Sequence, residues 1–229
     1  IEKGIQIVIC IDEFQQISDF EDSKTFQKKL RSVWQLQQHV SYCLFGSKKH
    51  LMNELFEKKN LPFYKFGDAI YLAKIETKYW IEYICKRFEN TGKHISPELA
   101  EEICRLVDNH SSYVQQLSWL LWIRTINTAT TEQLSYALED LLDQNNILFQ
   151  SETENLSAYQ MNFLKAIVDG IHTKFSSKEV ISKYNLGTSA NIVRLKNALL
   201  QKELIETNGK EIVLADPVFG VWFKKEMLY

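Results

Sequence analysis

The chain has 229 residues and a formal net charge of −2, so its overall charge does not favour nucleic acid or a membrane surface as a partner. Apolar residues make up 45% of the sequence and charged residues 24%, a composition that can build a hydrophobic core in one to three domains. No apolar run approaches the roughly 20 residues of a membrane helix, and no secretory signal is visible. We therefore expect a cytoplasmic protein with no membrane partner.

The first distinctive stretch is an apolar run, Ile5–Ile11, followed directly by Asp12 and Glu13. Such a run is typical of a parallel strand covered by helices on both faces. Because ligands of open parallel sheets bind beyond the carboxyl ends of the strands, the two carboxylates fall where a site is expected. The alternative interpretation is a buried strand that ends in a solvated acidic turn.

The following residues predict an alternating α/β pattern. Helices are expected at about 23–38 and 48–58, and two further strands at Val40–Phe45 and Ala69–Ile75. Alternation of strands and helices favours a parallel sheet with right-handed crossovers.

From Glu76 onward the pattern becomes helical. Helices are expected at about 78–90, 96–108, 112–125 and 130–145, the second beginning with Ser96 as N-cap and Pro97 at its first position. Residues 151–229 then predict three helices and a hairpin with Asn208-Gly209 at its turn, which together make a winged helix. The expected domains are 1–76, 77–150 and 151–229.

The four cysteines are predicted to be buried, reduced thiols, because each lies in an apolar stretch. None belongs to a C-x-x-C pair, so their spacing argues against a zinc site. They are Cys10, Cys43, Cys85 and Cys104.

Several short motifs, in this order, make the chain resemble the archaeal-type P-loop ATPases of the AAA+/STAND branch. They are Asp12-Glu13-Phe14-Gln15 after the first strand, Phe45-Gly46-Ser47 after the second, Pro62-Phe63-Tyr64, Val114-Gln115-Gln116-Leu117, and Asp216-Pro217-Val218-Phe219 with Trp222. The resemblance runs from about Ile5 to the end of the chain. It implies a partial three-layer α/β ATPase core, an all-α lid and a C-terminal winged helix.

The resemblance implies roles for five residues. Asp12 matches the Walker B acid that holds Mg²⁺ through water, and Glu13 the catalytic glutamate that polarises the attacking water. Ser47 stands where such enzymes place a sensor of the γ-phosphate, although a serine there is also a natural helix N-cap. Tyr113, at the start of a lid helix, is a candidate nucleotide contact, with His110 a weaker one.

Two features depart from the family pattern. The segment after Pro62 carries Lys65 in place of an arginine, and lysine lacks the planar fork that clamps a phosphate. The eight glycines include none in a G-x-x-x-x-G-K-[ST] loop, and the chain begins with Ile1. We therefore expect the C-terminal part of a longer protein, inactive by itself.

The missing loop also leads to a prediction about the sheet. If the phosphate-loop strand lies between Ile5–Ile11 and Val40–Phe45, these two strands are not neighbours in the complete protein. Unpaired edge groups each cost about 1–3 kcal/mol when buried. The isolated chain is then expected to re-pair the two strands, recruit another chain or expose adhesive edges.

The sequence thus predicts an ATPase that uses ATP and Mg²⁺ in the complete protein and couples hydrolysis to its winged helix. The alternative is a winged-helix DNA-binding or scaffold module with a degenerate ATPase core. The helix at 188–202 carries Arg194, Lys196 and Lys202, with Asn191, Asn197 and Gln201 as candidate base readers. Residues 151–229 contain ten basic and nine acidic side chains, a net +1, so a protein-packing role competes with DNA binding. A protein client or self-association is a further candidate partner.

Overall fold

The computed structural model describes residues 5–227, apart from the side chains of residues 49 and 50. The chain divides into an N-terminal unit that ends at Leu72 and a C-terminal unit that begins at Ala73. Each unit has a hydrophobic core of its own. Within residues 5–227, none of the helices combines the length and the apolar character needed to cross a bilayer.

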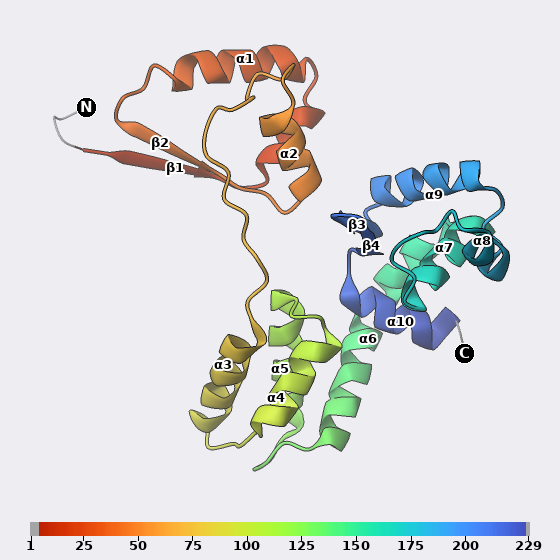
Figure 1. The fold of residues 1–229 in the computed structure, drawn as a ribbon. Coiled ribbons are helices and arrows are strands. Elements are labelled where there is room, and N and C mark those ends of the chain that lie inside the picture. Colours follow the sequence, from red (N-terminus) through yellow and green to blue (C-terminus); the bar gives the residue numbers. More distant parts are fainter. Residues whose placement is uncertain (1–4, 228–229) are drawn as a thin grey trace. The chain divides into compact units, whose positions relative to one another are not determined.

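The N-terminal unit is a small α/β structure (Figure 1). Its sheet has two described strands, each leading into helical structure. The elements are β1 (Ile7–Ile11), the 3₁₀ helix η1 (Phe14–Asp19), α1 (Ser23–Trp34), β2 (Val40–Leu44) and α2 (Lys49–Glu57).

Strands β1 and β2 are hydrogen-bonded parallel neighbours, with Ile7 opposite Val40 and Ile11 opposite Leu44. The pairing continues past both strands, because Phe45 N donates to Ile11 O at 3.0 Å and Phe14 N donates to Phe45 O at 3.0 Å. Pairing of these two strands with each other is one of the three outcomes that the sequence predicts for this chain by itself. Direct pairing satisfies the backbone groups that a gap would leave unpaired.

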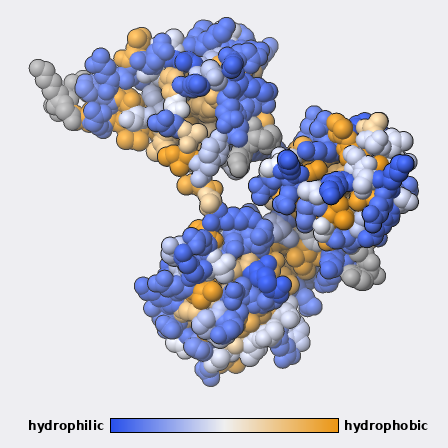
Figure 2. Space-filling model, viewed as in Figure 1, coloured by the Kyte–Doolittle hydropathy of each residue, from blue (hydrophilic) through white to orange (hydrophobic). Residues whose placement is uncertain are grey.

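The helices of the N-terminal unit cover only one face of this sheet. Tyr42 stacks on Trp34 of α1 with ring centroids 4.1 Å apart, and Leu44 packs on the unit's core. On the other face, Val8 is 65% exposed and Phe45 is 45% exposed. Figure 2 shows hydrophobic residues at the surface where β1 and β2 lie. The prediction that β1 is buried on both faces is wrong, because only one covered face exists in the described part of this unit.

The prediction that all four cysteines are buried is wrong for the two that lie on the uncovered face of the sheet. Cys10 and Cys43, which lie on the two strands, are both exposed, whereas Cys85 is half-buried and Cys104 is buried. An apolar sequence context does not bury a thiol when its side of the sheet is uncovered.

The segment Ala69–Ile75 does not form the third strand that its composition predicts. Ile70 is 85% exposed and Leu72 is 92% exposed. A strand requires a neighbour to complete its backbone hydrogen bonds, and no described strand pairs with this segment.

The core of the N-terminal unit is an aromatic cluster centred on Phe63, which is fully buried. The Phe63 ring lies edge-on to Phe14 and to Phe66, each with centroids 5.4 Å apart. Trp34 and Phe56 complete the cluster at 5.7 and 5.8 Å from Phe63. These contacts hold η1 and α1 against the covered face of the sheet. They therefore support the strand ends where Asp12 and Glu13 lie.

The C-terminal unit is mostly helical, with one antiparallel hairpin (Figure 1). Its elements are α3 (Thr77–Glu89), α4 (Pro97–Leu106), α5 (Ser111–Arg124), α6 (Thr131–Glu154), α7 (Ala158–Val168), α8 (Lys178–Tyr184), α9 (Ser189–Gln201), β3 (Ile205–Asn208), β4 (Glu211–Leu214) and α10 (Pro217–Met227).

Local capping signals explain where these helices begin. Ser96 accepts a hydrogen bond from Leu99 N at the start of α4, as the sequence predicts. Thr130 and Ser157 form capping boxes with Gln133 and Gln160 at the starts of α6 and α7.

Helix α6 is longer than predicted and runs 24 residues, through the expected domain boundary at 150. Helix α10 packs on its second half, where Phe149 contacts Phe219 and Trp222 with ring centroids 5.4 and 5.6 Å away. The indole of Trp222 donates to Asn146 Oδ1 at 2.8 Å. Lid-like and winged-helix-like elements therefore share one continuous core.

We predict that Phe63→Ala destabilises the N-terminal unit by about 3–5 kcal/mol, because it removes the buried centre of the aromatic cluster. Amide hydrogen exchange at Ile9 and Tyr42 reports this unit separately from the rest of the chain. Phe45→Ala is the matched control, because the Phe45 ring is 45% exposed. Equal losses of protection in the two variants would contradict the assigned core.

Candidate functional site

The polar residues predicted to share a site converge at the carboxyl ends of β1 and β2. Glu13 follows β1, and Ser47 follows β2. Glu13 Oε2 accepts a hydrogen bond from Ser47 Oγ at 3.3 Å. Asp12 lies beside them, and its Oδ1 accepts a hydrogen bond from Glu13 N at 2.8 Å. The structure thus brings Asp12, Glu13 and Ser47 together at one sheet end.

A sharp backbone turn at Glu13 produces this arrangement. Glu13 adopts a left-handed conformation with φ 49° and ψ 39°, which is uncommon for a residue other than glycine. Such strained positions are concentrated at functional sites. The turn ends β1 and directs the Glu13 carboxylate toward Ser47.

The hydrogen bonds also favour the charged form of this carboxyl group. The Ser47 hydroxyl, and then the Gln15 amide, hold the pKa of Glu13 below its ordinary value. Glu13 is therefore a carboxylate at neutral pH, which is the form that can accept a proton or orient water.

The buried amide of Gln15 is a feature whose role the sequence did not predict. Gln15 is 2% exposed, and its Nε2 donates to Glu13 Oε2. A Cβ at Gly46 would lie 1.8 Å from Gln15 Oε1, so any other residue at this position would require the Gln15 amide to move. The Gly46 requirement depends on a tertiary contact, and no local sequence signal could have revealed it.

The donor set at Asp12 suits a hard cation. Asp12 is exposed, and only its Oδ1 makes a hydrogen bond within residues 5–227. Mg²⁺ prefers oxygen ligands and commonly binds one or two carboxylates together with water and phosphate oxygens. Asp12 can supply one such carboxylate, and within the described residues no group of three or more His, Cys, Asp or Glu side chains is placed to hold a metal ion.

Tyr113 lies in the C-terminal unit, where it is 8% exposed. Its hydroxyl donates to Asp216 Oδ2 at 2.5 Å, and Asp216 Oδ1 accepts from Val218 N at 2.7 Å at the start of α10. Burial, and then this hydrogen bond, raise the pKa of Tyr113. The observed contact joins α5 to α10; the nucleotide role of Tyr113 stays a prediction. The ring of His110 lies 4.8 Å from that of Tyr113.

Lys65 is exposed and has a left-handed backbone with φ 51°. Its ammonium lies 5.6 Å from the centre of the neighbouring Tyr64 ring.

The outward face of α9 carries the polar residues proposed to read nucleic acid. Arg194, Asn197 and Gln201 are exposed, whereas Asn191 donates its amide to Leu186 O at 3.0 Å. A hollow of about 390 Å³ at the start of α9 is lined by Tyr159, Gly187, Thr188, Ala190, Asn191 and Arg194. Asn191 is therefore bonded locally, and Arg194 is the basic residue at this hollow.

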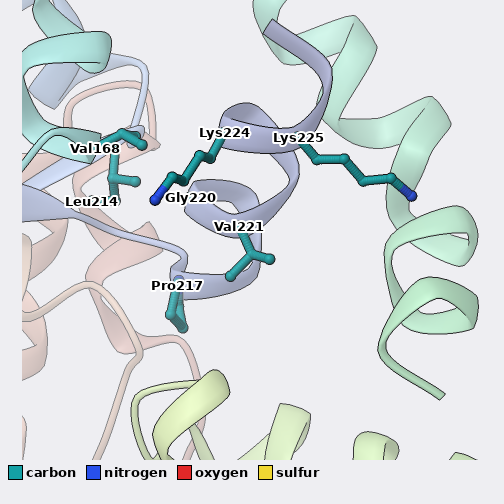
Figure 3. A pocket seen from close by; sticks show the side chains of 7 residues that line it. All are labelled: Val168, Leu214, Pro217, Gly220, Val221, Lys224 and Lys225. Atoms are coloured by element: carbon teal, nitrogen blue, oxygen red, sulfur yellow. The ribbon is translucent and has the colours of Figure 1, made fainter. Parts of the chain in front are cut away.

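A second hollow, of about 410 Å³, lies beside α10 and is mainly apolar (Figure 3). Lys224 extends toward Val168 and Leu214, whereas Lys225 extends away from them. The residues that line this hollow belong to the winged-helix part and include none of Asp12, Glu13 and Ser47.

Comparison with known proteins supports the mixed fold. A family model described as a probable winged helix domain matches residues 147–225. The fold is similar to that of the Walker-type ATPase of Pyrococcus abyssi, with a TM-score of 0.72 and 17% identity over 96% of this chain and 63% of that one. The chain therefore spans 63% of that ATPase's length.

Two further solved structures are similar with lower TM-scores. The RuvB Holliday junction branch migration motor of Thermotoga maritima gives a TM-score of 0.47 at 14% identity, over 90% of this chain and 66% of that one. The ORC1 protein of Aeropyrum pernix, in complex with DNA, gives 0.46 at 11% identity, over 96% and 64%. No curated protein matches the sequence. The predicted fold class, α/β plus all-α with a C-terminal winged helix, is confirmed: the chain has a small parallel sheet, additional helices and a match to a winged helix domain, and its fold is similar to that of a Walker-type ATPase.

Glu152, an acid whose charge acts on Tyr113, leads to a prediction about how stability depends on pH. Burial, and then the charge of Asp216, raise the pKa of Glu152 above 4.5. As the pH rises through 4.5, the unfolded chain ionises this group while the folded chain still holds the proton. The stability contribution of Glu152 is therefore present at low pH and is lost as the pH rises through the folded pKa.

We predict that Glu152→Gln raises the melting temperature at about pH 7 and flattens its decline above about pH 4.5, because glutamine carries no charge to bury. Calorimetric scans across this pH range measure the effect. Glu154→Gln, at an exposed position on the same helix, is the control. An unchanged pH profile in Glu152→Gln would contradict the assigned burial.

Proposed function

We propose that this chain supplies the acid-and-sensor half of the active site of a Mg²⁺-dependent ATPase. The observation that carries the proposal is the hydrogen bond from Ser47 to Glu13 at the ends of two adjacent parallel strands. A solvated acidic turn at the end of β1 would not require the next strand to end in a hydroxyl that contacts the same carboxylate. The Walker-type ATPase fold agrees with this proposal without establishing the activity.

In the proposed mechanism, the Asp12 carboxylate would hold Mg²⁺. The bound cation would neutralise charge on the β- and γ-phosphates. The Glu13 carboxylate accepts a hydrogen bond from the attacking water and orients it toward the γ-phosphorus. Ser47 Oγ lies close enough to Glu13 to hold that water or a phosphate oxygen, and Gln15 fixes the carboxylate from its buried side.

The site is incomplete without a phosphate-binding loop. Such loops supply backbone N–H groups and a lysine that cradle the phosphates, and the sequence has no G-x-x-x-x-G-K-[ST] motif. We therefore propose that turnover requires a phosphate-binding segment beyond this chain, and that the 229 residues alone do not hydrolyse ATP.

We predict that Glu13→Gln, introduced into the complete ATPase, lowers kcat by about 10²–10⁴-fold and leaves ATP affinity unchanged, because the amide keeps the shape but cannot act as a base. Phosphate release and nucleotide titration measure the two quantities. Glu21→Gln, at an exposed acid of the same unit, is the matched control. Turnover at the parental rate in Glu13→Gln would reject this role.

A second candidate function is DNA binding through α9. The exposed Arg194, Asn197 and Gln201 lie along the outward face of the helix that winged-helix proteins often place in the major groove. Lys210, at the hairpin turn, is also exposed. A scaffold role with a degenerate ATPase core is the competing proposal, because the net charge of this part is only +1.

We predict that charge reversal at Arg194 and Lys196 weakens DNA binding and reduces the slope of log K against log salt by about 1 per lost phosphate contact. Titrations at several salt concentrations give this slope. Reversal of Lys224 and Lys225 on α10 makes the same change in net charge outside α9. Identical salt slopes for wild type and the α9 variant would remove the DNA proposal.

A further inference from the structure

A buried hydrogen bond joins the winged helix to a helix that lies outside it. Tyr113 on α5 donates its hydroxyl to Asp216 Oδ2 at 2.5 Å, although the two residues are 103 positions apart. Asp216 directly precedes α10 and belongs to the residues that match the winged helix domain, whereas α5 ends before that match begins at residue 147. The bond therefore connects a helical part, α3–α5, with a winged-helix part, α7–α10.

The main packing partner that α5 and α10 have in common is α6. Helix α5 packs mainly on α3, α4 and α6, and α10 packs mainly on α6, α7 and β4. Trp222 on α10 also donates to Asn146 of α6. These contacts with α6 follow any bending of α6, because that helix continues into both parts. The Tyr113–Asp216 bond instead holds the start of α10 to α5, so it restricts how far α6 can bend between the two parts.

Asp216 uses both of its carboxylate oxygens. Its Oδ1 accepts hydrogen bonds from Val218 N at 2.7 Å and from Phe219 N at 3.0 Å, and it thereby caps the first turn of α10. Its Oδ2 accepts the bond from Tyr113. Because the cap attaches the carboxylate to the helix start, a displacement of α10 also displaces the acceptor from the Tyr113 hydroxyl. The bond therefore forms in only one orientation of α10 relative to α5.

The surroundings of Tyr113 favour a persistent bond. The residue is 8% exposed, so water competes little for its hydroxyl. Burial, and then the bond to Asp216, raise the pKa of Tyr113, so the hydroxyl keeps the proton that it donates. A hydrogen bond to a charged acceptor is also stronger than one between neutral groups.

We propose that the Tyr113–Asp216 bond is a conformational latch, which holds the winged-helix part against α5. Its loss lets α7–α10 pivot on α6 while both parts stay folded. The latch thereby sets the direction of the outward face of α9 relative to α3–α5. This proposal concerns the C-terminal unit alone, and it neither requires nor restates the ATPase function.

The test measures the distance between two spin labels in the purified chain. The labels are attached to unnatural amino acids at Glu82 on α3 and Asn197 on α9, which are both exposed, and pulsed electron spin resonance gives the distance distribution. Tyr113→Phe removes the donor and leaves the α10 cap in place. Asp216→Asn retains an oxygen for the cap, because asparagine caps helices as well as aspartate does, but replaces the second acceptor by an amide that only donates.

We expect one narrow distance population in the wild type and a second, released population in each single variant. Loss of a hydrogen bond to a charged group raises the ratio of released to docked molecules by about 10–100-fold. The double variant Tyr113→Phe/Asp216→Asn shows no more released molecules than the single variants, because both changes remove the same bond. Amide exchange in α4 and α9 stays at the parental rate, since both parts remain folded.

Asp140→Asn is the matched control. The Asp140 carboxylate accepts two hydrogen bonds from Arg124 at 2.7 Å, so this change weakens a contact between α5 and α6 that does not involve the winged helix. Its distance distribution should equal that of the wild type.

Three results would overturn the proposal. Either single latch variant would keep the distribution of the wild type, or Asp140→Asn would release the winged helix equally, or release would occur together with faster amide exchange throughout α4 and α9. Because none of these readouts involves ATP, they are independent of the outcome of the Glu13→Gln experiment.

Discussion

The parallel pairing of β1 with β2 is the interaction on which the candidate site depends. Its register sets Glu13 beside Ser47, and its continuation through Phe14 N and Phe45 O holds the turn that follows each strand. A slip of one residue would turn every strand side chain to the opposite face and separate the acid from the hydroxyl. The aromatic cluster around Phe63 supports this sheet end from one side, while the other side of the sheet carries the exposed thiols.

The C-terminal unit combines two predicted domains in one core. Helix α6 runs through both, α10 packs against its second half, and the Tyr113–Asp216 hydrogen bond joins α5 to the start of α10. Because a continuous helix and a shared core resist bending, we propose that movement of the lid-like helices carries the winged helix with it.

Local signals predicted the parts of the fold that depend on local chemistry. The Ser96 cap and the acids after β1 lie where the sequence placed them, and the hairpin turn lies one residue later than predicted, at Gly209-Lys210, because Asn208 pairs with Glu211. Local signals did not predict contacts between residues that are distant in the sequence. The Gly46–Gln15 approach and the Tyr113–Asp216 bond join residues 31 and 103 positions apart, and nothing near either residue encodes its partner. Composition misled the predictions for Ala69–Ile75 and for Cys10, because strand pairing and burial require neighbours that an apolar run does not itself supply.

The central claim is that Glu13 and Ser47 act as one unit on ATP. A double-mutant cycle in the complete ATPase, with Glu13→Gln, Ser47→Ala and both together, measures this most directly through kcat. If the account is right, each single change lowers kcat, and the double variant is no slower than Glu13→Gln alone. A Ser47→Ala enzyme with parental kcat, or losses that multiply fully in the double variant, would contradict it.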